Sequence, residues 1–186
     1  MIRGENMAEN SERLFCTVCG TEAKTFSFVL YGQPATKKNS SMMVKGRALL
    51  LPSKTFSRYE SRCHRQLMEL AKNQQLPHFS GPVRLTARYY LESAAHWPDL
   101  VGLMQATADI ISDQYRTENH RRVLRKTWLL SDDRIIKSWD GSEIAGIDRV
   151  SPRAEIVISA LPWRKDEADP YLRQKWQESL FSAEVL

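Results

Sequence analysis

The chain has 186 residues, 42% of them hydrophobic and 26% charged, and a formal net charge of +5. This length predicts one domain with appendages, and the charged fraction is too ordinary for wholesale disorder. No apolar run approaches the roughly 18 residues that span a bilayer, and the polar opening segment 1–15 does not resemble a secretory signal. Three cysteines are too few for a disulfide framework, so we expect a cytoplasmic protein with no membrane partner.

The positive charge is concentrated in two segments. Residues 37–65 contain eight Lys or Arg and one Glu, and residues 116–126 contain five Lys or Arg and one Glu. Such patches are typical of proteins that bind a polyanion, although two solvated faces would give the same composition.

In chain order, residues 1–24 form a predicted tail with a Cys-x-x-Cys knuckle, and a folded domain covers 25–161. Alternating apolar residues predict a strand over 25–31, and Gly46 predicts the turn of a hairpin joining 42–44 to 48–51. Apolar spacing of three to four predicts a helix from an N-cap at Ser53 to about Gln75. Alternation predicts the next strand over 83–91.

A second helix is predicted over 100–112, with Asp99 as its N-cap. Residues 113–128 have no clear pattern, a strand is predicted over 134–139, a loop over 141–151 and a last strand over 154–161. The remaining residues, 162–186, are interpreted as a tail or a short helix. This order predicts an α+β domain with a mixed sheet and two main helices packed on it.

Four aspartates lie where predicted elements begin or along a predicted helix. Asp99 starts the second helix, Asp109 lies within it, and Asp132 and Asp133 directly precede a strand. Carboxylate oxygens are ligands that Mg²⁺ prefers, and a bound Mg²⁺ can activate water against a phosphodiester. The plainer interpretation is that Asp99 only caps a helix and the Asp132–Asp133 pair only forms a turn.

Four segments in this order resemble the core of the RusA-type Holliday-junction resolvases: Phe28–Pro34, Ser53–Tyr59, Trp97–Ile111 and Leu130–Ile136. The resemblance covers residues 25–161. It implies a RusA-like α+β fold and a homodimeric nuclease of phage or prophage type. Such enzymes use Mg²⁺, or Mn²⁺ in its place, to cut branched DNA at four-way junctions in recombination and repair.

The resemblance also implies roles for individual residues. Asp99 matches the first aspartate of the family's Asp-Leu-Asp-Asn motif, and Asp133 matches the functional second member of its Asp-Asp pair, with Asp132 beside it. Asp109 matches an aspartate often present in the family's helix. Asp99, Asp132 and Asp133 are therefore the expected Mg²⁺ ligands, and together with Asp109 they are the expected catalytic residues.

Three residues depart from the family motif. Val101 replaces its second aspartate, Gly102 its asparagine and Gln105 a lysine that supports catalysis. The alternative function is therefore a catalytically weakened relative that binds branched DNA without cutting it, and a third is a small-ligand or protein-interaction domain. Three residues are candidates for substitute catalytic groups: Glu92, Asp113 and Lys137.

The basic patches supply the expected DNA contacts, which are Lys37, Lys38, Arg58, Arg62, Arg121 and Arg122. Cys16 and Cys19 have the spacing of one zinc knuckle, but a structural zinc site needs four ligands. Three interpretations stay open: two knuckles share a Zn²⁺ across a dimer, the two thiols are free, or the pair has a redox role.

Overall fold

The structure is a computed structural model that describes residues 25–37, 39–44, 47–95, 97–118 and 120–161. The tails predicted over 1–24 and 162–186 lie outside these residues, as do Cys16, Cys19 and Lys38. The elements are β1 (Thr25–Tyr31), β2 (Asn39–Val44), β3 (Arg47–Pro52), α1 (Lys54–Asn73), β4 (Val83–Leu91), α2 (Leu100–Ile111), β5 (Gln114–Glu118), β6 (Arg121–Lys126), η1 (Asp133–Ile135), β7 (Ile136–Ser138), β8 (Glu143–Ile147) and β9 (Arg153–Ala160).

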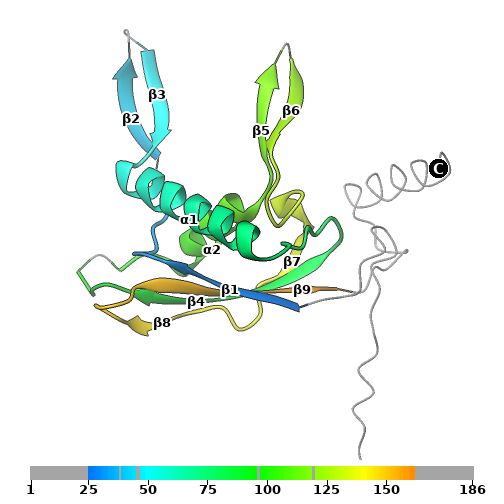
Figure 1. Cartoon of the computed structure of the whole chain (residues 1–186). Coiled ribbons are helices and arrows are strands. Elements are labelled where there is room, and N and C mark those ends of the chain that lie inside the picture. Colours follow the sequence, from blue (N-terminus) through cyan, green and yellow to red (C-terminus); the bar gives the residue numbers. More distant parts are fainter. Residues whose placement is uncertain (1–24, 38, 45–46, 96, 119, 162–186) are drawn as a thin grey trace, which may run out of the picture.

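A mixed five-stranded sheet with two helices on one face forms the body (Figure 1). Its strand order is β1-β9-β4-β7, and β8 also pairs with β4, farther along the same strand. Strands β1 and β4 are antiparallel to β9, whereas β7 and β8 are parallel to β4. The α+β class, the mixed sheet and the two main helices are therefore confirmed. In the part of the chain that the structure describes, no helix is long and apolar enough to cross a membrane.

Helix α1 follows from its sequence pattern. The hydroxyl of Ser53 accepts a hydrogen bond from the backbone N–H of Phe56 at 3.2 Å, which confirms the predicted N-cap. Phe56, Tyr59, Cys63 and Leu67 recur every three or four residues and are buried in the core. The arginines of α1 therefore lie on its exposed side, as the spacing predicts.

Helix α2 is fixed to the sheet by apolar packing and by one buried hydrogen bond. Leu103, Ala106 and Ile110 are buried, and the hydroxyl groups of Tyr89 on β4 and Thr107 on α2 are hydrogen-bonded at 2.8 Å. Because a buried hydroxyl without a partner is costly, this pair sets the position of α2 along β4.

Three segments differ from the predictions. Residues 113–128 contain a β-hairpin, β5–β6, whose second strand is exposed at every residue, so no buried face produces an alternating pattern. The predicted loop over 141–151 is wrong, because it contains β8, a half-buried strand. The strand predicted over 134–139 is shortened to β7, because the 3-10 turn η1 takes its first residues.

Two hairpins project from the helix-covered side of the sheet (Figure 1). One is β2–β3, which confirms the predicted pairing of 42–44 with 48–51, although the turn predicted at Gly46 lies outside the described residues, and the other is β5–β6. We call β5–β6 the arm. The helices lie between the bases of the two hairpins, so both extend beyond the surface that carries α1 and α2.

Candidate functional site

The structure brings Asp109, Asp132 and Asp133 into electrostatic contact. Partial burial, a hydrogen bond to Asp132 and the negative charges of Asp132 and Asp109 together raise the pKa of Asp133. The carboxylate of Asp133, in the turn before β7, is thus close enough to that of Asp132 beside it and to that of Asp109 on α2 for both to repel its negative charge. We call this group the carboxylate cluster. Mutual repulsion of this kind is relieved when a cation binds.

Within the cluster, Asp132 is held in place and Asp133 is exposed. The side chain of Asp132 is 6% exposed and accepts hydrogen bonds from Nε and Nη2 of Arg134, at 2.8 and 3.0 Å. It also accepts one from Nη2 of Arg122 at 3.2 Å, and it caps η1 through the backbone N–H of Arg134. Although burial alone would raise its pKa, the hydrogen bonds from Arg134 hold the pKa of Asp132 well below its usual range. Asp132 therefore positions the turn, and Asp133 faces solvent.

Asp109 lies on the outer face of α2. Its carboxylate forms an ion pair with Nζ of Lys37 at 2.8 Å. Val101 and Gln105 lie two turns and one turn before Asp109 on the same helix face, and both are exposed. Two of the three positions that depart from the RusA-type motif, Val101 and Gln105, therefore belong to the helix face that carries Asp109.

Asp99 is at the opposite end of α2. Its Oδ1 accepts a hydrogen bond from the backbone N–H of Gly102 at 2.6 Å, which confirms the N-cap predicted at Asp99. Ten residues of α-helix place Asp99 about 15 Å from Asp109 along the helix axis. Because Mg²⁺ binds its ligands at roughly 2 Å, a single ion cannot bind both carboxylates.

The chemistry of these groups suits a weakly bound magnesium ion better than a closed metal site. Over the described ranges there is no group of three or more His, Cys, Asp or Glu placed to hold a metal. Mg²⁺, however, is commonly bound by one or two carboxylates and completed by water and substrate phosphates. Asp133 provides one such ligand, with Asp109 nearby, whereas the oxygens of Asp132 are already occupied by Arg134 and Arg122.

A zinc site finds no support from Cys63. Cys63 is fully buried and, within the described residues, belongs to no group of three or more His, Cys, Asp or Glu placed to hold a metal. The predicted zinc ligands Cys16 and Cys19 lie outside the described residues.

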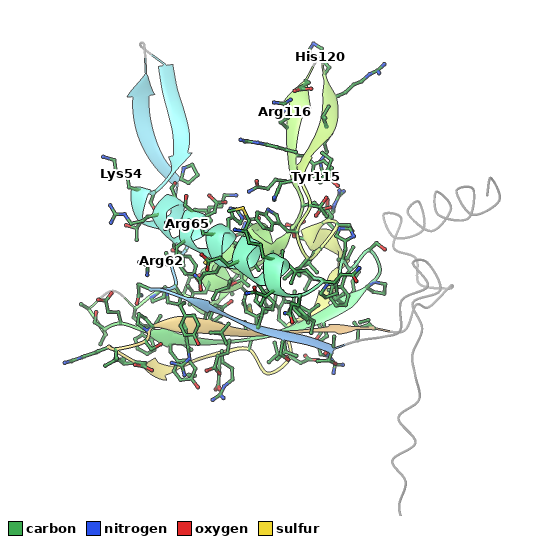
Figure 2. The ribbon with its side chains drawn as sticks, in the orientation of Figure 1. Lys54, Arg62, Arg65, Tyr115, Arg116 and His120 are labelled. Atoms are coloured by element: carbon green, nitrogen blue, oxygen red, sulfur yellow. The ribbon has the colours of Figure 1, made fainter. Side chains whose placement is uncertain are left out.

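The predicted DNA-binding residues fall on three parts of the surface. Arg58 and Arg62 are exposed on α1, in a row that we call the α1 ridge and that comprises Lys54, Arg58, Arg62 and Arg65. Figure 2 labels Lys54, Arg62 and Arg65 of this row. Arg121 and Arg122 lie on the arm, where Arg122 pairs with Asp132. Lys37 pairs with Asp109.

The three residues considered as substitutes for the missing catalytic groups lie in different surroundings from the carboxylate cluster. Asp113 is nearly buried, and its carboxylate accepts a hydrogen bond from the backbone N–H of Trp128 and pairs with His78. Lys137 donates to the backbone carbonyl of Arg134. Glu92 lines a cavity of about 700 Å³ beside the N-terminal ends of both helices. None of the expected metal ligands, catalytic aspartates or DNA contacts lines this cavity.

The half-buried His64 on α1 makes the free energy of unfolding depend on pH. Its ring stacks on Trp128 and bonds the carbonyl of Ile110 at 3.1 Å, and burial lowers its pKa from the ordinary 6.5. The unfolded chain therefore binds a proton at higher pH than the folded chain does. We expect the free energy of unfolding to fall as the pH drops below about 6.5. Urea unfolding of wild type and His64→Gln between about pH 5 and 8, on either side of the usual His pKa of about 6.5, tests this expectation. Parallel pH profiles of the unfolding free energy for the two proteins would contradict it.

The comparisons with known proteins add no family to these observations. No family model matches this chain, and a search of curated proteins finds no match.

Proposed function

We propose that this protein is a Mg²⁺-dependent endodeoxyribonuclease that cuts branched DNA, four-way junctions among them. The observation that carries the proposal is the convergence of Asp109, Asp132 and Asp133 beside a strongly basic arm. Carboxylates that repel one another favour binding of a divalent cation, and neighbouring arginines favour binding of a phosphate backbone. The resemblance to RusA-type resolvases supplies the substrate class and the expectation of a homodimer, whose two-fold symmetry would match a junction. The low number of cysteines favours a cytoplasmic setting.

Each group has a role in the proposed reaction. Mg²⁺, when bound, polarises the phosphate and provides a nucleophilic water. Asp133 is the exposed ligand, and Asp132, fixed by Arg134, holds the turn that presents it. Arginines of the α1 ridge and of the arm bind flanking phosphates, which makes binding sensitive to salt.

Lys37 supports the proposal where the family motif is incomplete. Gln105 replaces the family's catalytic lysine, but Lys37 brings an ammonium group to Asp109, one helical turn farther along the same face. We propose that Lys37 stabilises the charge that develops on the phosphate in the transition state. No matching substitute for the carboxylate lost at Val101 lies on that face of α2.

The alternative is a binding protein with weakened catalysis, and the exposed Val101 favours it. An apolar side chain at a position where the family has a metal ligand removes one oxygen from the site. In that case the same surface would bind a junction and leave it intact.

A junction-cleavage assay separates the two functions. The substrates are a labelled four-way junction and a linear duplex of one arm's sequence, each with MgCl₂ or EDTA. We expect cuts near the branch point only with the junction and only with Mg²⁺. If wild type binds the junction without cutting and the Val101→Asp/Gln105→Lys variant cuts it, the alternative holds. Equal binding of junction and duplex, with no cleavage by either protein, would contradict both.

A further inference from the structure

The arm extends into solvent on both of its faces. All six residues of β6 are exposed, and β5 and β6 pair only with each other among the described residues. Figure 2 places Tyr115 near the root of the arm, Arg116 farther out and His120 at the tip. A two-stranded β-ribbon without a hydrophobic core of its own is only marginally stable. The exposed arm therefore contributes little packing energy to the fold.

The root of the arm is nevertheless firmly attached. Asp113 accepts a hydrogen bond from the backbone N–H of Trp128 at 2.7 Å, which ties the residue before β5 to a residue after β6. The backbone N–H of Asp113 donates to Leu130, and the backbone of Leu129 bonds both Ile111 and Phe79. The arm therefore leaves the body at a fixed place.

Two arginines of the arm carry charge without an ion-pair partner among the described residues. The register puts Arg116, Glu118, Arg121 and Val123 on one face, and Tyr115, Thr117, Arg122 and Leu124 on the other. Arg116 pairs with Glu118, and Arg122 stacks on Tyr115 at 3.8 Å and bonds Asp132. Arg121 and Arg125 have no ion-pair partner within the described residues and are exposed. These two guanidinium groups are free to bind phosphate or a base edge.

The dimensions select the groove. A two-stranded β-ribbon fits the major groove of undistorted B-DNA, about 12 Å wide, whereas the minor groove, about 6 Å wide, admits one only where the duplex is bent and that groove opened. A second copy of the chain is a poor occupant, because four of the six residues of β6 are cationic and two such edges would repel. The charge of the ribbon is complementary to DNA along its whole length.

We propose that the arm enters the major groove of duplex DNA, with Arg121 and Arg125 as its principal contacts. The identity of the partner as DNA rests on the proposed function. Because Arg122 of the arm bonds Asp132 at 3.2 Å, a duplex engaged by the arm lies next to the carboxylate cluster. The arm thus holds one branch of the substrate at the site of cleavage.

The test is binding of a labelled linear duplex in EDTA, measured by fluorescence anisotropy over a range of salt. Arg121→Gln/Arg125→Gln is compared with the matched control Arg84→Gln/Arg88→Gln, which removes two exposed arginines from the helix-free face of the sheet. We expect the arm variant to lose roughly tenfold or more in affinity and its salt slope to fall by about 2, because each phosphate contact contributes about 0.9. The control should stay within about twofold of wild type.

A second duplex, with glucosylated 5-hydroxymethylcytosine filling the major groove, separates groove entry from contact with the backbone alone. Wild type should bind this duplex as weakly as the arm variant does, and the arm variant should bind both duplexes alike. Equal binding by the arm variant and the control, equal binding of the two duplexes by wild type, or no duplex binding by wild type would overturn the inference. Because none of these measurements involves cleavage, the proposed nuclease activity stands or falls separately in the junction assay.

Discussion

Asp133→Asn should lower Mg²⁺-dependent cleavage of a four-way junction by roughly 10²–10³-fold or more. The substitution removes the exposed carboxylate of the cluster and preserves its size. It leaves Asp132 with its hydrogen bonds to Arg134 and Arg122. Initial cleavage rates at saturating protein measure the loss.

The same substitution should leave the fold intact and DNA binding undiminished. Asp133 is exposed, and its negative charge is repelled by those of Asp132 and Asp109. Because the substitution removes this repulsion, the melting temperature of the variant should equal or exceed that of wild type. Asp140→Asn is the control, because Asp140 is an exposed aspartate that pairs with Arg84 at the opposite face of the sheet. Full activity of Asp133→Asn, or an equal loss in Asp140→Asn, would contradict the role assigned to Asp133.

Leu67→Ala should lower the free energy of unfolding by about 3–5 kcal/mol, the largest effect on stability that we expect from a single substitution. Leu67 is fully buried on the face of α1 that packs on the sheet, and truncation to alanine leaves a cavity there. Urea unfolding followed by circular dichroism measures the change.

Met68→Ala is the matched control for this experiment. Met68 is the next residue of the same helix and is 40% exposed, so its truncation should cost less than about 1 kcal/mol. Similar losses in the two variants would show that α1 does not bury the face that its apolar spacing defines.

The parts of the fold that could be predicted are those with a buried face. Strand β4 and helix α1 each bury one side, so their apolar residues recur with periods of two and of three to four. Strand β6 buries neither side and β8 is only half-buried at the edge next to β4, so neither leaves such a pattern. The arm could not be recognised for this reason, although its charge was evident.

The candidate site was predictable in its residue types and only partly in its geometry. The sequence places Asp132 next to Asp133, but it does not distinguish the buried carboxylate held by Arg134 from the exposed one. The ion pair of Lys37 with Asp109 joins residues far apart in the chain, and no local sequence pattern predicts it. The length of α2 separates Asp99 from Asp109, which could be calculated from the predicted helix alone.

Binding of Mn²⁺ in place of Mg²⁺, followed by electron paramagnetic resonance of the free ion, tests most directly whether the carboxylate cluster is a metal site. Wild type, Asp133→Asn and Asp140→Asn are titrated without DNA. We expect wild type and Asp140→Asn to bind Mn²⁺ in competition with Mg²⁺, and Asp133→Asn not to bind it. Equal binding by all three proteins, or no binding by any of them, would contradict it.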